Sequence, residues 1–298
     1  MAIEIRNLQK TYGDKKVLDD INIVIDQPGV YLIAGPNGSG KTTLLEILVG
    51  LRKMDHGQVR IHQVSSDGVK IKKMVGFLTQ QNTLRRNVTV KEELNLVKEL
   101  FGLKIDTYQY LEKFKLQEYY NQKTKNLSGG TKRRLLIAML FMPGYEIIVL
   151  DEPVSGLDTY NRDEIWNLIR EYAENHIVIV SDHYLNQAAQ YSDYIFLINK
   201  GKIVLEGKTE QILKEFQHDY VIKTRRKNHE ELLKMIKRKE ILRNLKVSGS
   251  VYNYFINRED YDDVKCLLSH QKFRLHPVNL EDIYFYHTGE LLKEVEEV

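Results

Sequence analysis

The sequence predicts an α/β fold, with an antiparallel β subdomain before its core, a helical insertion within it and a small C-terminal α/β domain after it. Two observations predict the core. Short, continuous apolar runs at 30–34, 147–150 and 177–180 have the length and composition of buried strands, predicted at 30–34, 147–151 and 177–181. The last two are separated by a helical pattern around 162–175, which is the spacing of a parallel crossover.

The residues on either side of the first core strand fit this fold. Apolar residues that alternate with polar ones indicate half-buried antiparallel strands. These are Ile3, Ile5, Ile21, Ile23 and Ile25. After 30–34 a glycine-rich turn leads into a helical pattern. We expect its apolar face to consist of Leu44, Leu45, Leu48 and Leu51.

A charged, helical insertion is expected at about 82–142, where Val90–Leu103 and Lys132–Met142 give the clearest helical patterns. The core then resumes, and two strands at 194–198 and 202–205 flank Asn199-Lys200-Gly201, a typical hairpin turn. The core domain is predicted to end at residue 218.

The remaining residues, 219–298, predict a separate C-terminal accessory domain. Its pattern is strand (219–223), helix (229–239), two strands (242–247 and 251–257), helix (261–270) and strand (272–277). This β-α-β-β-α-β order predicts a ferredoxin-like domain, closed by a last helix from Leu280.

Composition restricts the possible classes of protein. A hydrophobic fraction of 42% and a charged fraction of 29% are typical of a soluble, folded chain, and no apolar run approaches the roughly 20 residues that cross a bilayer. A net charge of +3 gives no support for nucleic acid as a partner. The single cysteine, Cys266, and nine histidines without metal-ligand spacing predict no structural metal. We expect a cytoplasmic location, because no signal peptide begins the chain.

A phosphate-binding loop is predicted between the strand at 30–34 and the helix after it. The pattern G-x-x-x-x-G-K-[ST] is matched by Gly35, Pro36, Asn37, Gly38, Ser39, Gly40, Lys41 and Thr42. Glycines let backbone N–H groups face the phosphates of ATP, and the helix N-terminus adds its positive end. Lys41 is expected to reach the β- and γ-phosphates, Thr42 to ligate Mg²⁺, and Thr43 to join the nucleotide contacts.

Acidic and basic groups follow the two later core strands. Asp151 and Glu152 end the strand at 147–151, at the sheet edge where α/β proteins bind ligands. Asp151 is predicted to hold the magnesium shell and Glu152 to act as the general base for the attacking water. His183, after the next strand, is predicted to contact the γ-phosphate and to help position Glu152 or water.

One further motif identifies a family. Because it contains Leu127-Ser128-Gly129-Gly130-Thr131, 23 residues before Asp151, the chain resembles an ATP-binding cassette (ABC) ATPase, a P-loop NTPase, over residues 1 to about 215. The resemblance implies that Ser128, Gly129 and Gly130 bind the γ-phosphate held by another subunit. Thr131 departs from the usual glutamine, so its effect on that contact stays open.

The resemblance also implies roles for residues outside the two motifs. Tyr12 would stack on adenine, and Asp158 would lie in a loop that faces the partner subunit. Gln80 would contribute to catalysis and to the metal site, although Gln81 is an alternative for that position.

The expected assembly is a homodimer, or a heterodimer with a second ABC ATPase, that closes around two ATP molecules. The chain would lie on the inner face of the membrane and drive export through separate membrane-spanning permease subunits. The tail Leu280–Phe285, with Thr288-Gly289 beyond it, resembles that of bacterial drug, polysaccharide and peptide exporters. The alternatives are an importer ATPase and a soluble ABC protein acting on ribosomes or DNA.

Overall fold

The computed structural model describes residues 2–65, 71, 74–81, 83–236, 239–265 and 273–290. Its contacts divide the chain into two compact units, Met1–Ile203 and Val204–Val298. The sequence-based boundary follows residue 218 instead, and the domain assignment 1–218 and 219–298 stays a prediction.

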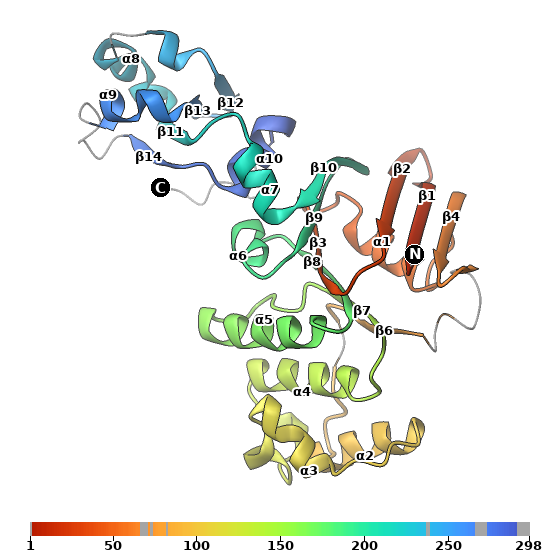
Figure 1. Ribbon diagram of the computed structural model, residues 1–298. Coiled ribbons are helices and arrows are strands. Elements are labelled where there is room, and N and C mark those ends of the chain that lie inside the picture. The colour runs from red at the N-terminus through yellow and green to blue at the C-terminus, as the bar shows by residue number, and fades with distance from the viewer. Residues whose placement is uncertain are drawn as a thin grey trace. The chain divides into compact units, whose positions relative to one another are not determined.

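An antiparallel sheet forms the N-terminal part of the first unit (Figure 1). Its strand order is β2-β1-β4-β5. The bounds are Ile3–Tyr12 (β1), Lys15–Ile25 (β2), His56–Ile61 (β4) and Val64–Ser65 (β5). The alternating isoleucines are all buried and pack into one core with the helix that follows the glycine-rich turn. The predicted antiparallel layer is therefore confirmed.

The core of this unit is a second sheet, with strand order β10-β9-β3-β8-β7-β6, in which the edge strand β10 continues past residue 203. The strands are Gly29–Ala34 (β3), Val75–Leu78 (β6), Ile147–Asp151 (β7), Ile177–Asp182 (β8), Tyr194–Asn199 (β9) and Lys202–Lys208 (β10). β3, β8 and β7 are buried neighbours and run parallel, as predicted. Their carboxyl ends, at Ala34, Asp182 and Asp151, therefore lie at one edge of the sheet.

Glycine is important at two places in the core sheet, the turn between β9 and β10 and strand β6. The predicted hairpin between β9 and β10 is confirmed, because Lys200 and Gly201 both have positive φ, 47° and 77°. Strand β6 was not predicted, since it is only four residues long and includes Gly76. A side chain at Gly76 would meet the ring of Tyr145 at 2.7 Å, so close packing, and not β propensity, selects glycine there.

Helices of the first unit are α1 (Lys41–Leu48), α2 (Val90–Leu100), α3 (Thr107–Tyr110), α4 (Gly129–Phe141), α5 (Thr159–Ala173) and α6 (Leu185–Ala189), with 3-10 turns at Leu111–Phe114, Gln117–Tyr119 and Thr124–Asn126. The helical insertion thus lies where it was expected. Leu51 was wrongly placed on the buried face of α1. The helix ends at Leu48, Gly50 has φ 72°, and Leu51 is 58% exposed.

The second unit contains an antiparallel sheet of order β12-β13-β11-β14. Its elements are α7 (Thr209–Glu215), β11 (Tyr220–Arg225), α8 (Arg226–Met235), a 3-10 turn (Lys239–Leu242), β12 (Leu245–Ser248), β13 (Val251–Ile256), a 3-10 turn (Arg258–Asp260), α9 (Tyr261–Lys265), β14 (Arg274–Pro277) and α10 (Leu280–Thr288). The predicted β-α-β-β-α-β order is confirmed, and this sheet order is that of a ferredoxin-like domain. Cys266 and the end of the helix predicted at 261–270 lie outside the described residues.

Candidate nucleotide site

The predicted phosphate loop connects β3 to α1, and two of its glycines are required by close contacts. A Cβ at Gly35 would lie 2.1 Å from the carbonyl oxygen of Ile198 in β9. Gly40 has φ 107°, and a Cβ there would lie 2.8 Å from the carbonyl oxygen of Val17. The backbone of the phosphate loop is therefore packed tightly against β9 and β2, and a residue larger than glycine at either position would disrupt this packing.

Lys41 lies within this loop. Its Nζ donates hydrogen bonds to the carbonyl oxygens of Gly35 at 2.8 Å and Pro36 at 3.1 Å. Burial lowers the pKa of Lys41, and the carboxylates of Glu152 and Asp151 oppose that shift. The hydroxyl of Ser39 is buried and has no hydrogen-bond partner within the described ranges. A buried ammonium and an unsatisfied hydroxyl fit a phosphate, which would supply acceptors to both.

The carboxyl edge of the sheet holds the two predicted carboxylates. The Ser181 hydroxyl donates to Asp151 Oδ1, and the Glu152 amide donates to Ser181 Oγ at 3.0 Å and to its carbonyl oxygen at 3.2 Å. Glu152 has φ 47°, a left-handed conformation that costs a residue with a side chain about 1–2 kcal/mol. The surrounding contacts hold Glu152 in a strained backbone conformation, as is common for residues at active sites.

Two predicted residues converge on the Glu152 side chain from different elements. Gln80 Nε2 donates to Glu152 Oε2 at 3.0 Å, and His183 Nδ1 lies 3.6 Å from Glu152 Oε1. Gln80, rather than the neighbouring Gln81, therefore contacts the candidate base. The sequence alone left that choice open.

The buried carboxylate of Asp182, beside His183, was not predicted. Its Oδ1 accepts from the Tyr184 amide at 2.7 Å, while Oδ2 has no hydrogen-bond partner in the described part of the chain. Burial raises the pKa of Asp182, with the nearby Glu152 adding to the shift and His183 opposing it. A raised folded-state pKa means that the ionised carboxylate costs stability above its unfolded pKa, near 3.8, and nothing below it.

We therefore expect Asp182→Asn to raise the Tm of the nucleotide-free protein at pH 7 by a few degrees, because the amide oxygen can still accept from Tyr184. Thermal melts of both proteins from pH 7 down to pH 4 would test this. The advantage should shrink as the pH falls, and an advantage that grew with acidity would contradict it.

The signature motif forms the start of α4. Ser128 is the N-cap, and its Oγ accepts from the Thr131 amide at 3.1 Å and contacts the Thr131 hydroxyl at 2.8 Å. Thr131 therefore contacts the signature serine itself. A Cβ at Gly130 would lie 2.6 Å from Asn161 Oδ1, so α4 packs tightly against the start of α5.

Asp158 caps α5 and was predicted in a loop that faces the partner. It accepts from the Asn161 amide at 3.0 Å and from Asn161 Nδ2 at 2.6 Å. Asn161 Oδ1 also accepts from Arg134 Nη2 of α4 at 3.2 Å. The signature helix and the Asp158 loop are thus joined within the chain. Asn161 was missed, although an aspartate three residues before it is a capping signal.

Tyr12 lies at the end of β1 and is 41% exposed. Lys10 Nζ and the guanidinium of Arg52 each lie 5.4 Å from its ring centroid. An exposed aromatic ring can stack on the adenine of a nucleotide, and cations near the ring can attract the phosphates of that nucleotide.

Oxygen ligands at this site fit a hard cation. Thr42, Gln80 and Asp151 supply a hydroxyl, an amide oxygen and a carboxylate, respectively. Across the described ranges, no group of three or more His, Cys, Asp and Glu could hold a metal ion. A magnesium ion here would therefore also need phosphate oxygens, as metals that accompany nucleotides do.

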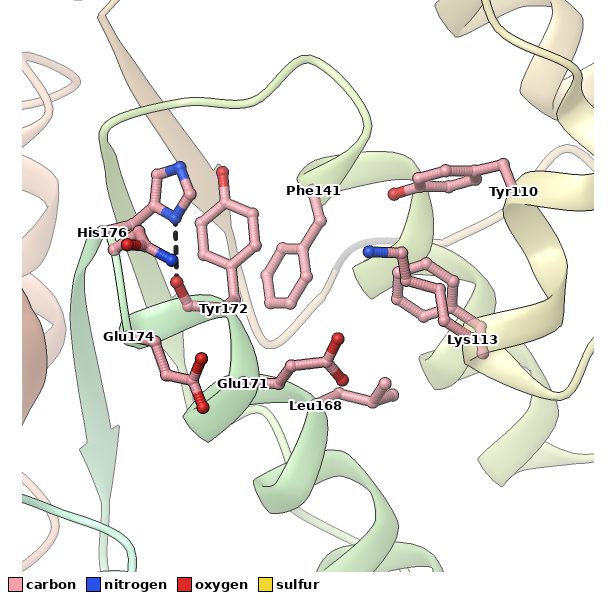
Figure 2. Close-up of a pocket in the computed structure, with 10 residues that line it drawn as sticks. Tyr110, Lys113, Phe141, Leu168, Glu171, Tyr172, Glu174 and His176 are labelled. Atoms are coloured by element: carbon pink, nitrogen blue, oxygen red, sulfur yellow. Dashed lines mark hydrogen bonds between the residues drawn. The ribbon is translucent and has the colours of Figure 1, made fainter.

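A cavity of about 300 Å³ lies elsewhere, between the helical insertion and α5 (Figure 2). Its lining residues are Tyr110, Lys113, Phe114, Phe141, Leu168, Glu171, Tyr172, Glu174, Asn175 and His176. The Tyr172 ring stacks on Phe141 and on His176, with ring centroids 4.1 Å apart in each pair. No predicted site residue lines this cavity, so the candidate site stays at the carboxyl edge of the sheet.

A strand, a phosphate loop and a helix, with a carboxylate pair at the end of β7 in the same parallel sheet, together define a P-loop NTPase. The family model described as "ABC transporter" matches residues 18–155. The chain is 28% identical to Nod factor export ATP-binding protein I of Sinorhizobium fredii (99% of this chain, 88% of that protein). It is 30% identical to daunorubicin resistance ATP-binding protein DrrA3 of Streptomyces coeruleorubidus (74% and 72%).

A solved dimeric ATP-binding cassette in a post-hydrolysis state, bound to ADP and Pi, aligns with a TM-score of 0.60 and 27% identity, over 70% of this chain and 98% of that one. The chain belongs to the ATP-binding proteins of ABC transporters and is an ATPase of that family. Among the helices of the described residues, none is both long and apolar enough to cross a membrane.

Proposed function

We propose that this chain is the motor subunit of an exporter. It binds and hydrolyses ATP with Mg²⁺, pairs with a second copy or a second ABC ATPase, and drives separate permease subunits from the cytoplasmic face of the membrane. The relatives named for Nod factor export and daunorubicin resistance support export over import or a soluble role.

The pairing rests on one observation, the exposure of the signature. Ser128 and Gly129 are exposed at the N-terminus of a 13-residue helix, and a Cβ at Gly129 would meet nothing within 4 Å. Such a helix start offers unpaired amides and a positive dipole end to an anion. The γ-phosphate on the partner's phosphate loop is the anion proposed to bind there.

Within one chain, the residues at the carboxyl edge would carry out hydrolysis. Lys41 and the loop amides hold the β- and γ-phosphates. Glu152 accepts a proton from the attacking water, with Gln80 orienting its carboxylate and His183 contacting the γ-phosphate. Thr42, Gln80 and Asp151 would hold Mg²⁺, which when bound neutralises phosphate charge.

Mixing two inactive variants tests whether the site is shared. We expect Lys41→Ala, which lacks the phosphate ligand, and Ser128→Arg, which blocks the signature, each to lose ATPase activity. In a mixed dimer, one site combines the intact loop of one chain with the intact signature of the other. Mixing should therefore restore activity, up to about a quarter of the wild-type sites by random pairing.

Phosphate release by each variant and by the mixture is the measurement. A mixture as inactive as its components would argue against a site shared between two copies. Restored activity in a mixture of Lys41→Ala with Glu152→Gln would contradict the proposed division of the site, in which the phosphate loop and the base belong to the same chain.

Export itself is tested with the membrane partner. A tagged chain isolated from detergent-treated membranes should co-purify with a permease. In inside-out vesicles containing that pair, ATP should drive substrate into the lumen, and the Glu152→Gln pair should not. Substrate moving outward would favour the importer alternative, and isolation with ribosomes would favour a soluble role.

A further inference from the structure

Arg133, on the signature helix α4, makes an unusual set of contacts that the proposed function does not use. Its Nε donates to the carbonyl oxygen of Pro153 at 2.6 Å, and its Nη2 donates to those of Glu152 at 3.2 Å and Asp151 at 3.4 Å. Its Nη1 donates to the carbonyl oxygen of Thr79 at 3.2 Å. One guanidinium thus binds four backbone carbonyls on two separate segments.

Three of these carbonyls belong to the backbone that carries the candidate base. Glu152 is held in its left-handed conformation from both sides: its amide donates to Ser181 of β8, and its carbonyl accepts from Arg133. The planar guanidinium carries five donors in a fixed fork and suits such a task, whereas the three donors of a lysine all sit on one nitrogen. Removing Arg133 would free one side of a strained peptide.

The fourth carbonyl precedes Gln80, the residue that contacts Glu152. Arg133 therefore holds the backbone of both members of the Gln80–Glu152 pair. Burial lowers the pKa of Arg133 to about 10, with the Asp151 carboxylate opposing the shift. The guanidinium therefore stays protonated at neutral pH and keeps all its hydrogen-bond donors.

The position of Arg133 in α4 adds a connection. It follows Gly130 by three residues, less than one turn, in the helix whose start carries the signature. We propose that Arg133 is a positioning residue for hydrolysis, which fixes the backbones of Glu152 and Gln80 to the signature helix. The position of the Glu152 carboxylate then depends on the position of α4. This inference rests on the proposed base role of Glu152.

The test is a double-mutant cycle with Arg133→Met and Glu152→Gln. Alone, Arg133→Met should lower kcat about 10- to 100-fold, the size of effect expected from misplacing a catalytic group by about 1 Å. KM for ATP and ATP binding should change little, because Lys41 and the loop are untouched. In the Glu152→Gln background, the residual turnover should fall much less, since no base is left to misplace.

Two further variants separate positioning from a general loss of folding. Arg133→Lys, whose single ammonium nitrogen can reach only some of the four carbonyls, should recover part of the lost kcat. Arg170→Met is the matched control, because Arg170 of α5 also donates to a backbone carbonyl, that of Tyr191 at 3.3 Å, and to Asp193. It should leave kcat unchanged, and a Tm for each variant reports its folding.

The outcomes distinguish this inference from the proposed function. Wild-type turnover by Glu152→Gln would overturn the base role itself. With that role intact, an Arg133→Met kcat equal to wild type, or a loss equally large in both backgrounds, would overturn the positioning role alone. Loss of ATP binding by Arg133→Met would also overturn it, since it would show a defect in the loop or the fold.

Discussion

Glu152→Gln should reduce ATP turnover by about 10²- to 10⁴-fold, the contribution typical of a positioned general base. The amide is nearly isosteric with the carboxylate and keeps an oxygen that can accept from Gln80 Nε2, now 3.0 Å from Glu152 Oε2. It cannot accept a proton from water. ATP should still bind, because the Lys41 contacts with Gly35 and Pro36 do not involve Glu152.

Phosphate release, equilibrium binding of ATP and size-exclusion chromatography with ATP would be measured on the same preparation. Binding without turnover should leave ATP-bound dimers that persist, because the γ-phosphate that joins the two chains is no longer removed. Glu164→Gln is the matched control: Glu164 pairs with Lys115 at 2.9 Å, away from the site. Normal turnover by Glu152→Gln would exclude this residue as the base.

The fold was predictable wherever one local pattern determined one element. Continuous apolar runs gave β3, β7 and β8, and alternation gave β1 and β2. The sequence did not reveal β6, where glycine at 76 is required by the Tyr145 ring, a contact 69 positions away in the chain. Such a requirement comes from tertiary packing, which local propensity does not include.

The candidate site divides in the same way. Lys41, Asp151 and Glu152 were predictable because their spacing is fixed by one strand, one loop or one helix start. Arg133 and Asp182 were not. Arg133 lies in a run of three basic residues that reads as a solvated helix face, and only the fold brings it to the carbonyls of Thr79 and Pro153. Their roles depend on contacts between distant segments.

Gly35→Ala should weaken ATP binding about 100-fold or more, although it adds only one methyl group. That methyl carbon would lie 2.1 Å from the Ile198 carbonyl oxygen and 2.9 Å from Ser39 Oγ. The first contact is with the backbone of buried strand β9, so the phosphate loop itself must move. Losing one or two charge-assisted hydrogen bonds to phosphate costs about 3 kcal/mol, which is about 100-fold in affinity.

Isothermal titration of ATP would measure this, with Gly144→Ala as the comparison. Gly144 has φ 71° and open space around a Cβ, so alanine there should cost about 1 kcal/mol of stability through the backbone and leave ATP affinity unchanged. Gly35 does not have a positive φ. The two variants therefore separate steric displacement of the loop from the general cost of replacing glycine. If Gly35→Ala bound ATP as tightly as Gly144→Ala, the loop would not be held in one shape by β9, and the geometry argued for Lys41 would lose its basis.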